Sequence, residues 1–594
     1  MQRRVSRVVL PTLVLGLVCL LAGRAAATVS VATDDGVVLT LNDDGSWNSL
    51  TIDGAPVPEL PGVTGGFVIA RMEGIRIPWQ RNVFYAGTPV TGTATQQGSD
   101  VHFTASTEGI WFDITLSGGG PYIGVDGTVT GPGTDRVFIV YFRIPVDADG
   151  WKWWDHVNMY RTIANGSSNW YLSNRQNPNV GVFHQARHPD LSLSPFGSIS
   201  RTSGAEMGIS LSPLLYPPCA YAIQYNSQGG FWIEFELGTT PQTTKHPNTA
   251  DFHFILYRHD PDWGVRSAAK RYYGFFPQWF QQVSRGGNWW WDKNVRPTNP
   301  EDFALVYFET YYWDDQYTID ANMYTCKYQE PWCWHLPYLE EATIEQKALD
   351  IPENDVTECI GKGQSVKESA QSTILSGAKN HDGSYIGPDD PSRWVDGDWG
   401  CGTTWRWITN PDPEIPNWRS FTINGAPGRN RGESVQHWEW YRQWGQEPGP
   451  GDTYSGLYHD SVGGGWAGWG AVHNFEPNHW GTYDYNPAIC MDRDQPAGVV
   501  CMWPIYSNIE FAKVAHEQMA SEDRVVMGNA GAEYALQLMA PFMDMFGAGE
   551  HFSSDSTVLD QSITRMIAYQ KPCSYLLGGR SEAAIKSGML LGIY

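Results

Sequence analysis

Residues 456–470 read GLYHDSVGGGWAGWG, and this stretch decides the predicted fold of the second half of the chain. Its first five residues form a short, mostly apolar run that ends in Asp460, as expected for a buried strand of a parallel sheet. The glycines that follow indicate a loop in which the backbone can closely approach another group. A strand that runs directly into such a loop is typical of the first half of a βα unit.

Similar strand candidates lie on both sides of this stretch. They are FALVYFE (303–309), GSYI (383–386), FTING (420–424), RVVMGN (524–529), PFMDMF (541–546) and CSYLL (573–577). Helical periodicity appears between several of them, for example in IYSNIEFAKVAHEQMA and VLDQSITRMIAYQ. Seven βα units predict a (β/α)8 TIM-type barrel rather than an open sheet. The eighth strand would be LLGIY at the end of the chain, so we expect a barrel that is just closing or C-terminally incomplete.

The first half of the chain has a different pattern. Short alternating or β-branched runs are separated by Gly, Asp, Asn and Pro, and helical periodicity is nearly absent. The runs are VSVATDD, GVVLTLN, GGFVIARM, DVHFTAST, IWFDITLSG, YIGVDGTVTG, RVFIVYFRIP, GGFWIEFELG and DFHFILYR. So many strands over so long a span predict a large antiparallel sandwich, an all-β N-terminal supersandwich.

These patterns divide the chain into four parts. We expect a signal peptide at residues 1–27, a β-sandwich domain at 28–261, a connecting helix and linker at 262–300, and a barrel at 301–594. The connecting helix has apolar residues at helical spacing, and Pro277 should interrupt or kink it.

The N-terminus predicts export. Residues 1–27 combine a basic start, an apolar run and a small-residue end at Ala25-Ala26-Ala27. A retained membrane anchor is the alternative, but the apolar run is short and contains Pro11. A lipoprotein attached at Cys19 is a weaker alternative, because Val18 stands where such signals have a small residue. We expect a secreted or periplasmic protein with no membrane association after signal cleavage.

Charge and composition limit the class of function. The formal net charge is −24, which disfavours nucleic-acid binding because that needs a basic surface. Aromatic residues make up 13% of the chain, with 28 Trp. Their rings suit packing in a core, and exposed ones suit stacking on the C–H faces of a sugar. The eight cysteines left after signal cleavage permit disulfides, for example Cys326 with Cys333 or Cys490 with Cys501, but their connectivity stays open.

Acidic residues at strand ends are the main candidates for catalysis. In a parallel barrel the active site lies at the carboxyl ends of the strands. Asp460 closes one strand candidate, Glu550 follows another, and Asp544 lies inside the latter. Glycoside hydrolysis needs two carboxyl groups in unlike environments, one ionised and one protonated. Asp460 with Glu550 is therefore the expected pair, and Asp544 is the substitute for the second role.

GLYHDSVGG resembles the strand-four nucleophile segment of retaining glycosidases that combine a β-sandwich with a TIM barrel, similar to glycoside hydrolase families 31, 36, 66 and 101. The resemblance implies hydrolysis of α-linked sugars with retention. It also implies that Asp460 is the nucleophile and Glu550, or Asp544, the acid/base. The WxDMNE pattern of family 31 and the KxDxN pattern of family 36 are absent, so no particular substrate is implied.

Further polar and aromatic residues follow the strand candidates or lie in the long loops, where they could bind an oligo- or polysaccharide. They are Glu309, Trp313, Asp314, Trp394, Trp418, Arg429, His459, Trp466, Asn529 and His551. Loop packing is the alternative for many of them. No cofactor is expected, since no phosphate-binding or dinucleotide motif is present. The acidic segment 388–400 leaves calcium open, although a solvated loop fits it better. The alternatives to a hydrolase are a non-catalytic carbohydrate-binding protein and a polysaccharide lyase.

Overall fold

The structure is a computed structural model that describes most of the first half of the chain and parts of the second. The described residues are 27–75, 84–172, 192, 194–243, 246–290, 296–310, 316–329, 333–337, 381–383, 404–408, 455–459, 474–476, 499–502, 505–529, 536–547 and 558–574. Residues 1–26, the acidic segment 388–400 and LLGIY lie outside them. Within these ranges, no helix is both long and apolar enough to cross a membrane.

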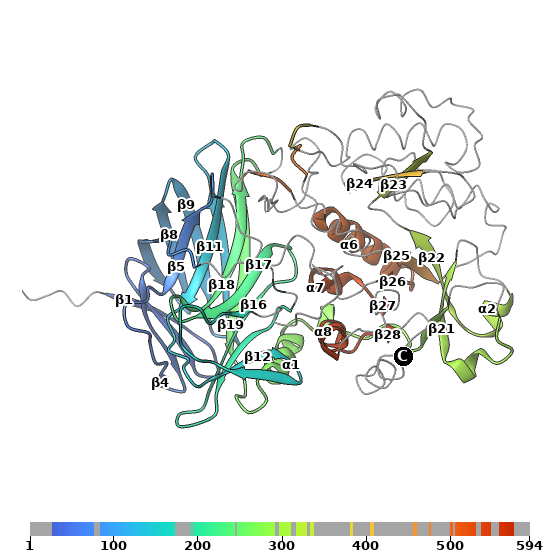
Figure 1. The fold of residues 1–594 in the computed structure, drawn as a ribbon, viewed down its shortest axis with the longest axis horizontal. Coiled ribbons are helices and arrows are strands. Elements are labelled where there is room, and N and C mark those ends of the chain that lie inside the picture. Colours follow the sequence, from blue (N-terminus) through green and yellow to red (C-terminus); the bar gives the residue numbers. More distant parts are fainter. Residues whose placement is uncertain are drawn as a thin grey trace, which may run out of the picture.

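Three antiparallel sheets form the first half (Figure 1). The nine-stranded sheet has the order β13 (Met159–Thr162), β12 (Lys152–His156), β15 (Gly197–Arg201), β16 (Met207–Pro213), β19 (Thr249–Arg258), β10 (Ile123–Thr130), β9 (Ile110–Ser117), β8 (Asp100–Thr107), β7 (Gly92–Gln97). The six-stranded sheet has the order β14 (Tyr171–Leu172), β17 (Ala220–Asn226), β18 (Gly230–Thr239), β11 (Arg136–Ile144), β5 (Gly66–Arg71), β6 (Thr88–Pro89). The four-stranded sheet has the order β1 (Thr28–Ala32), β2 (Val37–Asn42), β3 (Trp47–Ile52), β4 (Ala55–Pro56).

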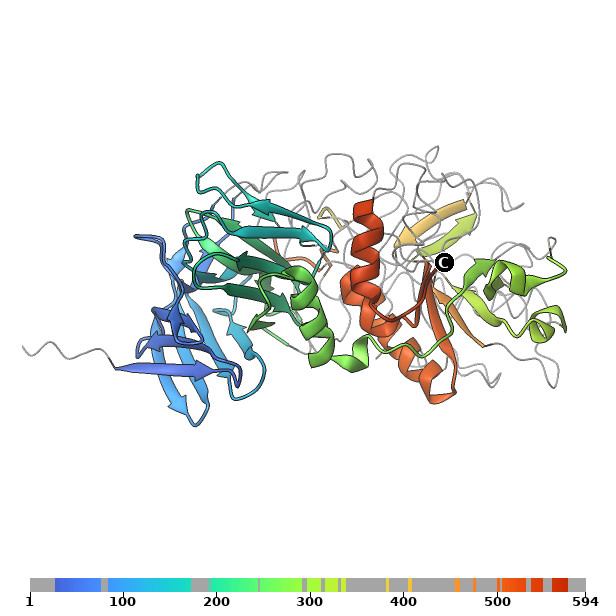
Figure 2. The same cartoon turned by 90° about the horizontal axis from the view of Figure 1, so that it is seen from below.

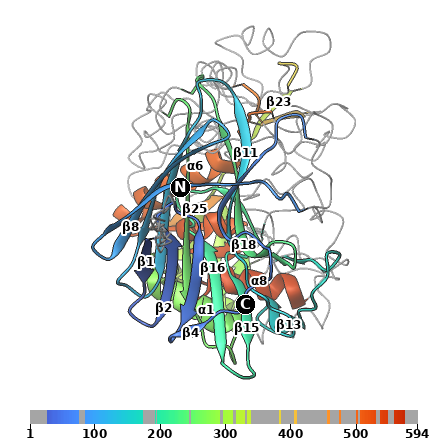
Figure 3. The ribbon, with the colours of Figure 1, turned by 90° about the vertical axis from the view of Figure 1, so that its left-hand side faces the viewer.

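Phenylalanine rings join the nine-stranded and six-stranded sheets. Phe142 on β11 lies 5.2 Å from Phe254 on β19, centroid to centroid, and Phe235 on β18 lies 5.5 Å from Phe252. Because side chains alternate between the two faces of a strand, every second residue of these strands packs into the core between the two sheets. The prediction of an all-β first half is confirmed, and Figure 3 shows its strands from the sandwich side.

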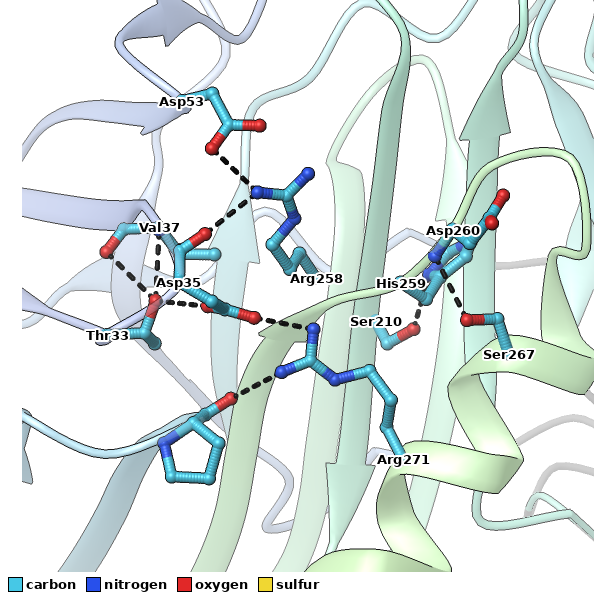
Figure 4. Close-up of polar contacts among 11 residues, drawn as sticks. Thr33, Asp35, Val37, Asp53, Ser210, Arg258, His259, Asp260, Ser267 and Arg271 are labelled. Atoms are coloured by element: carbon cyan, nitrogen blue, oxygen red, sulfur yellow. Dashed lines mark hydrogen bonds and ion pairs between the residues drawn. The ribbon is translucent and has the colours of Figure 1, made fainter.

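A helix leads out of the sandwich. α1 (Val265–Phe275) buries residues at three- and four-residue spacing, including Ala268, Ala269 and Tyr272. The short 3-10 turn η2 (Pro277–Trp279) follows it, so Pro277 ends the helix as predicted. Two arginines fasten this exit to the four-stranded sheet, as Figure 4 shows: Arg271 on α1 pairs with Asp35, and Arg258 pairs with Asp53.

In the described part of the second half, seven parallel strands form one sheet. Their order is β20 (Asn288–Trp290), β21 (Leu305–Thr310), β22 (Tyr324–Gln329), β25 (Gly456–His459), β26 (Val525–Asn529), β27 (Met545–Gly547) and β28 (Cys573–Ser574). The described helices and turns are η3 (Pro300–Phe303), α2 (Gln316–Asp320), α6 (Ile505–Ser521), α7 (Leu536–Met539), η9 (Ala540–Phe542) and α8 (Val558–Ala568). A separate antiparallel pair consists of β23 (Cys333–Pro337) and β24 (Thr404–Ile408).

The strand prediction for this half needs corrections. β20 lies in the segment that we predicted to be a linker, and no strand was predicted at the position of β22. PFMDMF is not one strand, because residues 540–542 form a 3-10 turn and β27 begins at Met545. Of the predicted strands GSYI and FTING, only Gly383 lies inside the described residues, and it belongs to no strand there. β25 and β27 are nevertheless fourth and sixth in the sheet, as predicted.

The parallel sheet is strongly curved toward its inner face (Figure 2). Trp289 on the first strand is fully buried, and its ring lies 5.1 Å from that of Tyr458 on the fourth. Its ring also approaches Gly547 on the sixth strand, where an added Cβ would lie 3.1 Å away. Contacts between strands that are not neighbours in the sheet require strong curvature. The seven described strands thus form a nearly closed barrel.

Helices α6 and α8 lie between the parallel sheet and the sandwich (Figures 1 and 2). Tyr216 of the sandwich donates a hydrogen bond of 2.8 Å to Glu510 on α6. Tyr273 on α1 stacks on Tyr569, directly after α8, with ring centroids 3.8 Å apart. The buried apolar residues of the sandwich and of the outer barrel face belong to one continuous core.

Candidate functional site

The inner face of the barrel can be followed strand by strand. Tyr307, Tyr458, Met527 and Met545 belong to one buried cluster together with Trp289. Because side chains alternate along a strand, positions two residues further on lie on the same face. The cluster therefore fixes which residues point inward at the carboxyl ends of the strands.

Three described residues occupy these inward positions. They are Glu309 on β21, Asn529 on β26 and Gly547 on β27. Asn529 is 1% exposed, and it stands opposite Gly547 in the strand register. A carboxylate and an amide on the inner face of a parallel barrel, at the carboxyl ends of its strands, are groups that can hydrogen-bond a polar ligand.

Gly547 leaves room at this end of the barrel. A Cβ there would lie 3.1 Å from the carbonyl oxygen of Gly528 and 3.1 Å from the indole of Trp289. A side chain here would push against backbone and a buried ring, so the position favours glycine. Trp289 lies directly beside Gly547 and fills the barrel interior between β25 and β27.

Most of the site residues predicted from the sequence lie outside the part of the chain that the structure describes. They are Asp460, Glu550, Trp313, Asp314, Trp394, Trp418, Arg429, Trp466 and His551. Two of them have a fixed relation to described strands along the chain: Asp460 directly follows the last residue of β25, and Glu550 comes three residues after β27.

Asp544 lies at the other end of the strands. It immediately precedes β27, and its backbone N–H and carboxylate both bond Val526 near the start of β26. The carboxylate Oδ2 accepts the Val526 N–H at 2.8 Å. The prediction that Asp544 lies inside a strand was wrong, because β27 begins at Met545. Its position at the amino ends of the strands does not support the predicted substitute role as acid/base.

Asp544 belongs to a buried polar cluster there. His516 Nδ1 on α6 lies 3.4 Å from Asp544 Oδ2, and the Lys571 ammonium donates to the Ala540 carbonyl at 2.8 Å. Burial lowers the pKa of Lys571 to about 8, and the negative charge of Asp544 acts against this shift. Ser284 donates to the Asp544 carbonyl and so connects the segment before β20 to the segment before β27.

His459 points away from the barrel interior. It alternates with Tyr458 and thus shares a face with Leu457, which packs in the core between barrel and sandwich. Its side chain is 1% exposed. The expected contact between His459 and a ligand in the barrel therefore conflicts with its position.

Sequence reasoning missed Trp289. The signal was present as the aromatic run NWWW, residues 288–291, but flanking glycines and charges made the segment resemble a loop. Strands of three residues carry too few alternations to be recognised by period alone.

Comparisons with known proteins give no family. No family model matches the sequence, and no curated protein matches it. Solved structures with low similarity include the α-N-acetylgalactosaminidase NagBb from Bifidobacterium bifidum, with TM-score 0.42 and 9% identity over 95% of this chain and 92% of that one. A sulfoquinovosidase of glycoside hydrolase family 31 from E. rectale has TM-score 0.42 and 11% identity over 93% and 74% of the two chains.

A third structure resembles only part of the chain. It is a putative aldose 1-epimerase from Escherichia coli K12, with TM-score 0.23 and 10% identity over 39% of this chain and all of that one. TM-scores below 0.5 do not establish a shared fold, so these likenesses assign neither a fold nor an activity to the chain.

Proposed function

We propose that this chain is an exported glycoside hydrolase that cleaves O-glycosidic bonds of an oligo- or polysaccharide, α-linked and with retention, at the carboxyl ends of the parallel strands. The proposal includes completion of the seven described strands to a (β/α)8 barrel. One observation supports it: Tyr458 lies on the inner barrel face, and Asp460 comes two residues later in the sequence, directly after β25. Because side chains alternate along a strand, we expect position 460 to share the face that carries Asn529 and Glu309.

In the proposed mechanism Asp460 attacks the anomeric carbon and the leaving oxygen takes a proton from Glu550. Glu550 then removes a proton from water, which hydrolyses the glycosyl-enzyme bond. Glu550 comes three residues after the sixth strand, which supports its role, because the catalytic residues of parallel barrels follow the carboxyl ends of the strands. Glu309 and Asn529 would bind sugar hydroxyls.

The test uses activated aryl glycosides with purified full-length protein. Asp460→Asn should lower kcat roughly 10⁴-fold or more without changing the melting temperature, because it removes the nucleophile alone. Glu550→Gln should affect substrates with good leaving groups much less than natural glycosides, since a good leaving group does not need the proton. NMR of the first-formed anomer reports retention.

Two outcomes would contradict this proposal. Unchanged turnover in Asp460→Asn would remove this residue from the mechanism. Binding of glycans without any hydrolysis, in the wild type as in both variants, would instead identify a carbohydrate-binding protein.

A further inference from the structure

Exposed aromatic rings lie at one edge of the nine-stranded sheet, where the start of α1 lies against β12 (Figure 1). Tyr160 on the outermost strand, β13, is 48% exposed, and Trp263, just before α1, is 58% exposed. Both belong to segments that pack on one buried ring, that of Trp154 on β12. Large apolar side chains that are exposed and gathered in this way mark a surface that contacts another molecule.

Trp154 holds the two segments together. Its ring lies 5.2 Å from that of Tyr160, centroid to centroid, and its indole N–H donates to Ser200 Oγ at 3.1 Å. A Cβ added to Gly264 would lie 1.9 Å from Trp154 Cε2, and the φ angle of Gly264 is 51°, so this position strongly favours glycine. The backbone that carries Tyr160 and Trp263 is therefore fixed before any ligand binds.

Positively charged side chains border these rings. Lys152 Nζ lies 4.8 Å from the centre of the Tyr160 ring, and Cζ of Arg266 lies 5.6 Å from the centre of the Trp154 ring. Lys270 is exposed one turn further along α1, on the side of the helix that carries Arg266. Within the described residues, none of these three cations forms an ion pair with a carboxylate. They are therefore available to a ligand.

The charge of these two segments differs from that of the whole chain. Residues 152–162 and 260–270 contain four basic and three acidic residues, whereas the chain has 40 basic and 64 acidic ones. Two of the three acids have other partners, because Asp155 pairs with Arg161 at 2.8 Å and Asp260 accepts a backbone N–H at 2.9 Å. The segments therefore attract an anionic group although the protein as a whole repels one.

We propose that these side chains, which we call the edge platform (Lys152, Tyr160, Trp263, Arg266 and Lys270), bind a polysaccharide chain that contains uronic acid units. The C–H faces of the sugar rings would stack on Tyr160 and Trp263, which combine an apolar ring with a polar edge. The carboxylates of the uronic acids would accept charge-assisted hydrogen bonds from Arg266 and the two lysines.

The exposure of the edge platform favours a polymer over a single sugar. Tyr160 and Trp263 are open to solvent, so a monosaccharide would bury little surface on them, whereas a chain can contact both rings at once. An open surface also accepts the middle of a chain and needs no chain end. The edge platform would thus attach the protein to a polysaccharide without reacting with it, and this role does not depend on the proposed chemistry of the barrel.

The test is affinity gel electrophoresis of the full chain in gels that contain polygalacturonate or alginate, which carry uronic acids, or dextran, which is neutral. Trp263→Ala should weaken binding to the acidic polysaccharide about tenfold, because a stacking ring is lost. Arg266→Gln should also weaken it and should make binding less sensitive to salt, since one charge pair is lost. Both variants should keep the wild-type melting temperature, because both side chains are exposed.

Trp111→Ala is the matched control, because Trp111 on β9 is 50% exposed near the opposite edge of the same sheet. Weaker binding in Trp263→Ala and Arg266→Gln, with binding kept in Trp111→Ala and in Asp460→Asn, supports the edge platform whether or not the barrel hydrolyses glycosides. Equal binding of Trp263→Ala and wild type would refute it, as would binding that disappears only in Asp460→Asn. Dextran binding as strong as that of the acidic polysaccharides, or no binding of either acidic polysaccharide to the wild type, would also refute it.

Discussion

The two ends of the parallel strands differ in how their polar residues are used. At the amino ends, Asp544 is bonded to Val526 and lies beside His516 and the buried Lys571. At the carboxyl ends, Glu309 and Asn529 lie on the inner barrel face. The comparison teaches that an acidic residue next to a strand is informative only when its end of the strand is known.

Trp289→Ala should give the largest loss of stability. It empties the barrel interior beside Tyr458 and Gly547 and should cost about 3–5 kcal/mol, as other Trp-to-Ala changes in cores do. Trp290→Ala is the control, because Trp290 is only half-buried on the same strand. Chemical denaturation measures both, and equal losses would contradict the central role of Trp289.

Lys571→Met tests the amino-end cluster through pH. In the folded protein the pKa of Lys571 is lowered to about 8 from its ordinary value of 10.5, so the charged form is disfavoured by folding. That penalty is fully present below pH 8 and disappears as the pH rises to 10.5. At about 1.4 kcal/mol for each pKa unit, wild-type stability should gain about 3 kcal/mol over this range relative to the variant. If the difference in stability between wild type and variant does not change with pH, folding does not lower the pKa of Lys571.

Asp544→Asn sharpens the contrast between the ends. It weakens the bond to Val526 and removes the negative charge near Lys571, so we expect a loss of about 2 kcal/mol in stability. Turnover at temperatures where the variant stays folded should be close to that of the wild type. Glu309→Gln should do the reverse, with weaker substrate binding and nearly unchanged melting. A catalytic defect in Asp544→Asn that exceeds the one in Glu309→Gln would overturn the assignment of the two ends.

Gly547→Ala should have the smallest effect of the four. The added methyl group would lie 3.1 Å from the Gly528 carbonyl oxygen and from Trp289, a tight contact that small shifts can relieve. We expect a loss of about 1 kcal/mol, at the low end for overpacking. Gly547→Ala combined with Trp289→Phe should recover part of it, which thermal unfolding of the double variant can check.

The sandwich was predictable because its strands are long and alternate. Ile110–Ser117 and Ile123–Thr130 each bury every second residue, which is the signal that the sequence carries. α6 and α8 were predictable from helical periodicity, and both were found. The parallel strands were harder, because strands of two to six residues buried on both faces show no alternation.

Asp544 shows why the candidate site was only partly predictable. PFMDMF looked like one apolar strand, yet Pro541 cannot donate to a ladder and instead begins a 3-10 turn. The strand therefore starts four residues later than the apolar run suggests, and the acid inside the run falls before it. His459 was misplaced for a related reason, since only the buried neighbours of Tyr458 reveal which face is inward.

The stacking of Tyr273 on Tyr569 and the bond from Tyr216 to Glu510 join the halves through a common interior. Cleavage of the chain near Asp262 would expose an apolar surface on each fragment to solvent, and each fragment would be prone to aggregate. The sandwich is thus not a module that recombination could transfer to another barrel. The sandwich and the barrel should therefore evolve as one unit, with compensating mutations on the two sides of their shared core.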